Sequence, residues 1–409
     1  MTHDTPRTAA ELGLMQGTPP PPDKEVTFWN WEKAPYHRWS FLHVGALVPT
    51  ARVWRGDGPV SRLEPAPVDL DGVTSPTTRG EVLTVPEQLD RTYTDGLLVL
   101  HDGRIATERY FNDMTPATRH LLMSVSKSVI GTLAGVVIGR GQLSPDDLVV
   151  DVLTELRGTS FEGATVRHLL DMRTGTQFIE EYEDPSSDAG MLDWVADWGP
   201  PPPGQVSPGL YGYVPMLAND RAHGGTFDYR SILTDVLGWV LARAADASVA
   251  DLFSEAVWAP LGAQEDAEIT VDHHGCPWVD GGICATLRDM ARFGQMHLDE
   301  GSLGGRPIVP AEWIHDTRLG GPDSLAAFAG SEQHDGYPLA FYRNQWWVIR
   351  PDEGVYMASG IHGQFVYINV PASAVIVKFS TLPVALDDHI WLDHVAMFDA
   401  IAATLAGAA

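Results

Sequence analysis

Strand-like segments stand toward both ends of this chain and helix-like segments fill its middle, an order that limits the folds open to it. Near the start, residues 94–110 have the pattern of a β-hairpin that turns at His101-Asp102-Gly103. An amphipathic helix over 387–405 closes the chain. Before it, four consecutive segments alternate or run apolar like neighbouring strands, at 344–350, 354–359, 364–370 and 374–380. The sequence therefore predicts an antiparallel sheet assembled from both ends of the chain.

The middle of the chain is mainly helical in pattern. A long segment without helical periodicity, 174–225, is rich in proline and glycine, which is typical of loops that form or cover a binding site. Strict alternation of strands and helices is missing, which argues against a doubly wound sheet or an eight-fold barrel. We expect helices at 118–140, from a cap and first turn at 144–147, at 165–172, at 231–245 and at 287–298.

These patterns divide the chain into three parts. Residues 1–25, with prolines at 19–22 in a row, are expected to form a flexible arm. Residues 26–112 together with 290–409 are expected to form a sheet domain, with 113–289 inserted as a mainly helical subdomain. The predicted fold class is α/β of the α+β type, an antiparallel sheet from N- and C-terminal segments flanked by helices.

The chain is strongly acidic. It carries 54 Asp and Glu against 27 Lys and Arg, a formal net charge of −27. A surface of this sign repels phosphate backbones and anionic lipid, so we expect neither nucleic acid nor membrane as a partner. Residues 1–22 lack the apolar core of a signal peptide, and no run of about 18 apolar residues occurs. We therefore expect a cytoplasmic protein.

Lys127 stands out among four lysines because it lies at the start of an apolar helical pattern. A buried ammonium is unfavourable unless it has a partner or a task. Ser124 precedes it by three residues, so the two side chains share a helix face and the amine can reach the hydroxyl. Burial lowers a lysine pKa, which would leave a neutral amine able to take the serine proton. The spacing predicts Ser124 as a nucleophile with Lys127 as its base.

Other patterns that could carry chemistry are weak. The sequence has no Gly-x-Ser-x-Gly elbow and no glycine-rich nucleotide loop. His273, His274 and Cys276 stand close together, but no second cluster at ligand spacing completes a metal site, so we interpret them as loop residues. We expect neither a metal nor a cofactor.

Residues 124–127, Ser-Val-Ser-Lys, resemble the Ser-x-x-Lys signature of the penicillin-recognising serine hydrolases, which include class C β-lactamases and penicillin-binding proteins. The second motif of that family is Tyr-x-Asn, and its place is taken here by Tyr229-Arg230-Ser231. The resemblance implies that Tyr229 exchanges protons with Lys127, and it puts Ser231 where asparagine is usual. Further segments similar to the family follow in its order, at 141–147, 165–170 and 281–294.

The third family motif is different in this chain. Family members carry Lys-Thr-Gly on an inner strand, whereas residues 357–364 occupy that place without a lysine. The resemblance implies that Gly360 lets the backbone approach the substrate, and that the N–H of Ile361 joins the N–H of Ser124 in an oxyanion hole, with His362 beside the substrate. The missing cation disfavours β-lactams and peptidoglycan, but a hole made of backbone donors leaves acyl transfer intact.

Within the family, residues 37–41, 92–95, 121–128 and 361–364 are similar to segments of hydrolases of 6-aminohexanoate (nylon) oligomers. This likeness implies that Tyr182 hydrogen-bonds the scissile amide, that Asp193 pairs with a substrate ammonium, and that Asp280 lines the pocket. Each of the three would otherwise be interpreted as a solvated loop residue. The expected substrate is a small linear amide or short ester that carries an amine.

Two alternative functions stay open at this point. The same acyl-enzyme chemistry serves a carboxylesterase or a transacylase, since a fold does not fix a function. A binding protein on a catalytically dead scaffold is the other alternative, and the joint presence of Ser124, Lys127 and Tyr229 speaks against it. A homodimer is left open as well.

Overall fold

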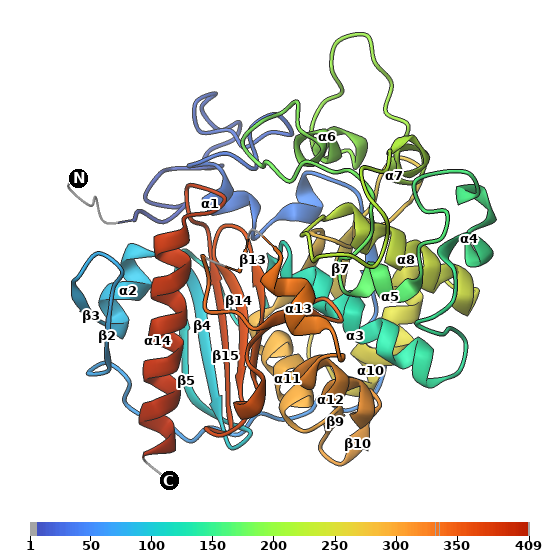
Figure 1. The fold of residues 1–409 in the computed structure, drawn as a ribbon. Coiled ribbons are helices and arrows are strands. Elements are labelled where there is room, and N and C mark those ends of the chain that lie inside the picture. Colours follow the sequence, from blue (N-terminus) through green and yellow to red (C-terminus); the bar gives the residue numbers. More distant parts are fainter. Residues whose placement is uncertain (1–5, 332, 335, 408–409) are drawn as a thin grey trace.

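A seven-stranded antiparallel sheet forms the frame of the molecule (Figure 1). The computed structural model describes residues 6–331, 333–334 and 336–407. The strand order is β11-β12-β13-β14-β15-β4-β5, so the two ends of the chain meet where β15 pairs with β4. The bounds are β4 Thr94–His101, β5 Arg104–Tyr110, β11 Phe341–Arg343, β12 Trp346–Arg350, β13 Val355–Gly360, β14 Gln364–Asn369 and β15 Ala374–Ser380.

Helices cover both faces of this sheet. Helix α11 (Leu287–Leu298) lies so close to one face that a Cβ on Gly294 would meet Val375 of β15 at 2.4 Å. Helix α14 (Asp388–Ala406) runs along the other face (Figure 1), where Phe398 contacts Phe365 of β14 with ring centres 5.4 Å apart. Every residue of β14 and β15 is therefore buried. This cover explains why these strands appear in the sequence as near-continuous apolar runs.

A mainly helical region lies beside the sheet and includes a smaller sheet of order β1-β7-β8-β6. The strands of the smaller sheet are β1 Thr50–Val53, β6 Arg119–Leu121, β7 Ala267–Thr270 and β8 Ile283–Thr286. Two-stranded pairs join β2 Thr74–Pro76 to β3 Val82–Thr84, and β9 Ser302–Leu303 to β10 Arg306–Pro307. The remaining helices are α1 His37–Ser40, α2 Val85–Arg91, α3 Val125–Gly139, α4 Val149–Val152, α5 Val166–Leu170, α6 Asp188–Val195, α7 Leu210–Tyr213, α8 Ile232–Ala245, α9 Val249–Phe253, α10 Ala259–Leu261, α12 Ala311–Leu319 and α13 Ser324–Ala329.

Most predicted elements are confirmed, and the antiparallel sheet built from both ends of the chain is the observed architecture. The hairpin, the four C-terminal strands and the helix over 287–298 lie where the patterns predicted them. The division of the chain at 112/113 and 289/290 stays a prediction. The long loop-rich segment 174–225 contains α6 and α7, two short helices that the composition did not indicate.

Two predicted helix starts are wrong. The helix expected over 118–140 begins at Val125, because residues 119–121 form β6 and pair with β8 instead. The turn 144–147 starts no helix: the Ser144 N–H donates to the Asp147 carboxylate at 2.7 Å, and α4 begins at Val149. Both segments have a short pattern that is compatible with a helix. Pairing with a strand distant in sequence prevents a helix in the first segment, and a local turn prevents it in the second.

Part of the expected flexible arm is packed against the body of the protein. Ala9 and Leu14 are buried, and the Ala9 N–H donates to Asn112 at 2.7 Å. Arg38 holds the same segment through the Arg7 carbonyl. Residues 1–5 of the arm lie outside the described residues. Among the described helices, none is long and apolar enough to span a bilayer.

Candidate active site

The predicted nucleophile lies in a tight turn between β6 and α3. Met123, directly before it, has a φ of +47°, a left-handed conformation that costs energy for a residue with a side chain. Ser124 is the N-cap residue of α3, but its side chain accepts no hydrogen bond from the first turn of the helix. Its hydroxyl is therefore available for other contacts, beside the positive end of the helix dipole.

The structure brings the three predicted catalytic residues together. The Lys127 amine donates to Ser124 Oγ at 2.7 Å and to the Asp280 backbone carbonyl at 3.0 Å. The Tyr229 side chain lies close enough to Lys127 and Ser124 for both to lower the pKa of its hydroxyl, against the burial that raises it. Lys127 is 1% exposed and lies 5.2 Å from the centre of the Tyr229 ring. The three side chains therefore form one cluster.

The protonation state of Lys127 differs from the sequence prediction. Burial does lower the pKa of the amine, as expected. However, Tyr229 and the carboxylates of Asp280 and Glu180 act in the opposite direction, and together they raise the pKa of Lys127 above its usual value. The prediction of a neutral amine in the resting site is therefore wrong, because it counted burial and omitted neighbours distant in sequence.

Asp280 belongs to a buried pair of acids behind Lys127. Its Oδ1 lies 3.8 Å from the Lys127 nitrogen, and its backbone N–H, like that of Val279, donates to Asp235. Burial and the neighbouring Asp280 raise the pKa of Asp235 well above its usual value. Oδ2 of Asp235 and Oδ2 of Asp280 have no hydrogen-bond partner among the residues that the structure describes. The negative charge of Asp280 raises the pKa of Lys127.

Tyr229 lies directly ahead of α8, on an aromatic support. Its ring stacks on Trp347 of β12 with ring centres 5.3 Å apart and an angle of 18° between the planes, and it meets the edge of Tyr342. Burial raises the pKa of Tyr229, and the Lys127 ammonium opposes this effect. The phenol is therefore neutral in the resting site and able to donate a proton.

Glu180 is a site residue that the sequence analysis missed. Its carboxylate accepts from the Ser231 N–H at 2.8 Å, from the Ser231 hydroxyl, and from the Tyr182 hydroxyl at 2.9 Å. Burial raises the pKa of Glu180, while Lys127 lowers it. Ser231, which replaces the usual asparagine, thus donates hydrogen bonds to Glu180, and Glu180 in turn holds the Tyr182 hydroxyl in place. No spacing in the sequence marks this carboxylate, because its partners are contributed by other segments.

The backbone around β13 approaches the nucleophile closely. A Cβ on Gly360 would lie 2.9 Å from the Ser124 nitrogen and 2.8 Å from the Leu122 carbonyl oxygen, so only glycine fits there. The N–H groups of Ser124 and Ile361 donate to no acceptor among the residues that the structure describes. Two unpaired donors beside a serine hydroxyl are the arrangement that an oxyanion hole requires.

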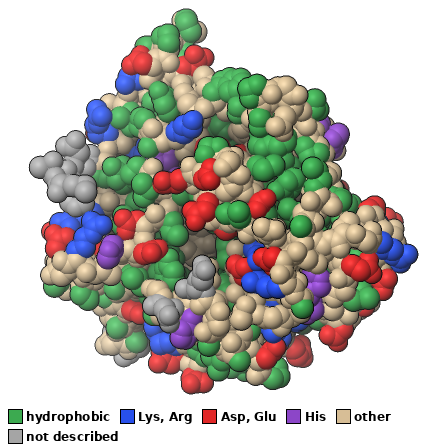
Figure 2. All heavy atoms as spheres, turned by 45° about the horizontal axis from the view of Figure 1, so that its top comes forward, with side chains coloured by type: hydrophobic (Ala, Val, Ile, Leu, Met, Phe, Trp, Pro, Cys, Tyr) green, Lys and Arg blue, Asp and Glu red, His purple; other side chains and the backbone are tan. Residues whose placement is uncertain are grey.

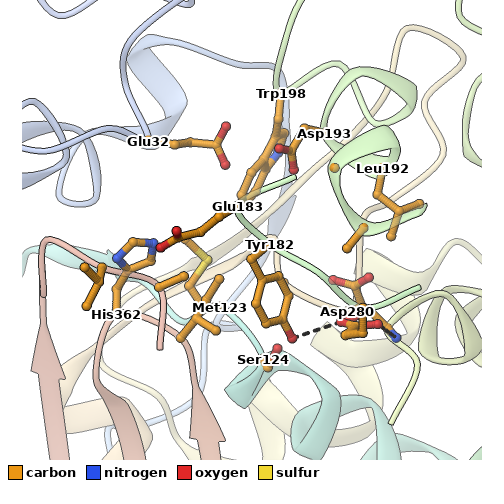
Figure 3. Close-up of a pocket in the computed structure, with 18 of the residues that line it drawn as sticks. Glu32, Met123, Ser124, Tyr182, Glu183, Leu192, Asp193, Trp198, Asp280 and His362 are labelled. Atoms are coloured by element: carbon orange, nitrogen blue, oxygen red, sulfur yellow. Dashed lines mark hydrogen bonds between the residues drawn. The ribbon is translucent and has the colours of Figure 1, made fainter. Parts of the chain in front are cut away.

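Two cavities meet at Ser124. The larger, about 450 Å³, is lined by five of the predicted substrate-binding residues, namely Tyr182, Asp193, Ser231, Asp280 and His362 (Figure 3). The smaller, about 220 Å³, is lined by Gly360, Tyr229 and aromatic side chains. His362 offers no charge: its ring bonds the Leu382 carbonyl oxygen at 2.7 Å, and burial lowers its pKa to about 3.

Comparison with known proteins identifies the family of this chain. The β-lactamase family model matches residues 85–396. The chain is 36% identical over 361 residues to the 6-aminohexanoate-dimer hydrolase of Paenarthrobacter ureafaciens, covering 88% of this chain and 89% of that protein.

Solved structures show the same architecture. A Bacillus anthracis structure described as a candidate 6-aminohexanoate-dimer hydrolase superposes with a TM-score of 0.85 at 27% identity, covering 94% of this chain and 98% of the other. EstCE1, a hydrolase with promiscuous acyltransferase activity, shares the fold with a TM-score of 0.59 at 18% identity, covering 78% of this chain and 96% of its own. The chain therefore belongs to the β-lactamase family and is a hydrolase of that family.

Proposed function

We propose that this protein is a serine amidase that cleaves small linear amides through an acyl-enzyme on Ser124. The observation that carries the proposal is the 2.7 Å contact between the Lys127 amine and Ser124 Oγ, with the Tyr229 ring centre 5.2 Å from the same amine. The 36% identity to a 6-aminohexanoate-dimer hydrolase supports linear amides as the substrate class. A cytoplasmic location and a homodimer stay predictions of the sequence.

The first half of the reaction forms the acyl-enzyme. Loss of one proton from the electrostatically coupled pair of Lys127 and Tyr229 creates the base, which then takes the proton of Ser124. Oγ attacks the amide carbon, and the N–H groups of Ser124 and Ile361 hold the oxyanion. The C–N bond breaks as the pair returns the proton to the leaving nitrogen, Tyr229 being its neutral donor.

The second half releases the acyl group. Water attacks the acyl carbon, its proton passes to the same pair, and the bond from the carbon to Ser124 Oγ breaks as the oxygen is reprotonated. Because neighbouring groups raise the pKa of Lys127, the base form becomes more abundant as pH rises. We therefore expect kcat/KM to increase from neutral into alkaline pH.

The test is Ser124→Ala with 6-aminohexanoate dimer and p-nitrophenyl acetate as substrates. Turnover of both should fall by at least about 10³-fold, and the acyl adduct seen by mass spectrometry should disappear. Ser128→Ala is the matched control on α3, since Ser128 donates only to the Gln345 carbonyl and lines neither cavity. Retained turnover in Ser124→Ala would refute the proposal.

Ester turnover without any amide cleavage would identify an esterase or transacylase instead, and failure of a fluorophosphonate to label Ser124 would identify a binding protein.

A further inference from the structure

The two cavities that meet at Ser124 differ sharply in charge. The larger is lined by five carboxylates (Glu32, Glu180, Glu183, Asp193 and Asp280) and by one cation, Lys33. Of the described residues that line the smaller cavity, only Glu180 is charged, and it is shared with the larger. Figure 2 shows acidic side chains gathered around a hollow on this face of the molecule. A substrate that spans the nucleophile therefore has one end in an acidic chamber and the other in an apolar one.

Glu32 and Asp193 form the outer part of the acidic chamber. Figure 3 shows the Glu32 carboxylate pointing across the cavity toward Asp193. Glu32 is held there by its neighbour Trp31, whose indole N–H donates to the Trp198 carbonyl at 2.9 Å and whose ring meets that of Trp198 at 4.8 Å. The N-terminal segment thus brings a second acid to Asp193 of α6.

Neither carboxylate is satisfied by the protein. Among the described residues, no donor makes a hydrogen bond or ion pair with the side-chain carboxylate of Glu32 or Asp193, although the Asp193 backbone carbonyl accepts from the N–H groups of Trp198 and Gly199. Deeper in the chamber, the Asp280 side chain is only 5% exposed, and its Oδ2 has no donor in the usual hydrogen-bond range. Burial and mutual repulsion raise the pKa of Glu32 well above its usual value, and burial with Asp280 raises that of Asp193 to about 7. A ligand cation would relieve this repulsion and supply the missing donors.

The smaller chamber suits an apolar or aromatic group. Its walls include Tyr337, Leu339, Trp347 and Trp391. Tyr229 lines this chamber and not the acidic one. Because Tyr229 is the neutral donor of the trio, the atom that it protonates on departure lies on this side of Ser124. The leaving half of the substrate therefore occupies the aromatic chamber, and the acyl half occupies the acidic one.

We propose that the enzyme acts on aminoacyl arylamides, in which the acyl half ends in a cation and the leaving half is aromatic, and that Glu32 selects the cation together with Asp193. This inference rests on the acyl-enzyme mechanism proposed above. Glu32 is a specificity residue that the sequence analysis did not single out, and its role is separate from the chemistry at Ser124.

The experiment compares three probes. These are 6-aminohexanoyl anilide (the cationic anilide), the uncharged hexanoyl anilide, and hexanoyl 4-(aminomethyl)anilide, whose cation is on the leaving half. We expect the first to be cleaved with a kcat/KM at least about tenfold above each of the other two, a factor that corresponds to one favourable ionic contact. In Glu32→Gln, the KM of the cationic anilide should rise about tenfold with kcat within twofold, while the hexanoyl probe is unaffected.

Glu25→Gln is the matched control, because it removes the same charge from the same segment at an exposed position that lines neither cavity. Equal effects of the two variants, or cleavage of the hexanoyl 4-(aminomethyl)anilide as fast as the 6-aminohexanoyl anilide, would overturn the inference. Fluorophosphonate labelling of Ser124 is measured in parallel. Labelling without the expected probe preference refutes the inference alone, whereas absence of labelling refutes the proposed function.

Discussion

Two lysines are buried in this protein, and their surroundings give them opposite properties. Lys127 lies at the start of α3 among Tyr229, Asp280 and Glu180, which raise its pKa. Lys378 lies in the middle of β15, fully buried, where its amine donates to the Ser380 hydroxyl. Burial lowers the pKa of Lys378 to about 7, and Asp95 opposes this only in part.

The difference shows that burial alone does not set the state of a buried amine. Both side chains lose water to a similar extent, so the neighbouring acids decide which of them is charged at neutral pH. At Lys127 those acids belong to a cavity that opens at the nucleophile, which is where proton transfer is needed. Lys378 lines neither cavity at Ser124, so we expect it to be a packed core residue.

The largest expected effect is on activity, where substitution of Lys127 but not of Lys378 should reduce turnover. Lys127→Met should reduce turnover of 6-aminohexanoate dimer by at least about 10³-fold, because it removes the base and the charge that holds Ser124 Oγ. Lys378→Met should leave kcat/KM within about threefold, since no atom of Lys378 reaches the cavities. Steady-state kinetics at one pH measures both. Comparable losses of turnover in the two variants would show that the different surroundings of the two lysines have no bearing on activity.

A smaller effect is expected for the other lysine, Lys378, and it concerns the free energy of unfolding. The folded pKa of Lys378 lies below the unfolded value of about 10.4, so between about pH 7 and 10 the unfolded chain binds more protons. The lysine therefore destabilises the fold most below pH 7, and this cost disappears as pH approaches 10. Lys378→Met should raise the free energy of unfolding at pH 7 by about 1–3 kcal/mol, with the gain shrinking toward pH 10. Denaturant titrations at several pH values measure it, and a gain that does not change with pH would contradict the assignment.

The smallest effect tests which charges hold the proton on Lys127. Asp235→Asn combined with Asp280→Asn removes both acids behind Lys127, including the Asp280 charge that raises the pKa of the amine, so this pKa should fall and the neutral base should be more abundant at neutral pH. We expect kcat/KM for the uncharged p-nitrophenyl acetate at pH 7 to rise by up to about tenfold, with the rising limb of the pH profile moving to lower pH. Asp235→Asn alone, which leaves the Asp280 charge in place, is the control. An unchanged profile in the double variant would assign the effect to Glu180 and Tyr229.

Local patterns predicted much of this structure. The predicted strand of residues 374–380 and the predicted helix of 287–298 agree with the observed bounds. In both segments the apolar pattern and the polar residues that end it lie within the segment itself or directly beside it. The helix expected from 118 failed at its first turn, where pairing of 119–121 with β8 outweighs local preference. Sequence neighbours cannot show that pairing, since the partner strand lies far along the chain.

The candidate site divides in the same way. Ser124 and Lys127 were found from spacing because both lie on one helix turn, and Tyr229 from a family resemblance. Glu180 and Glu32 were missed, since each acquires its role from a contact with another segment: Ser231 for Glu180, and Asp193 for Glu32.

By itself, the sequence determined the strands of the main sheet, most of the longer helices and the pair of side chains that share one helix face, because these depend on residues a few positions apart. Only the tertiary structure decided which buried amine is protonated and which chamber carries the negative charge. The physical reason is that electrostatic interactions depend on distance in space and on exclusion of water, and the acids that set them here are contributed by the N-terminal segment, the loop before α6, α6 itself and the segment before β8.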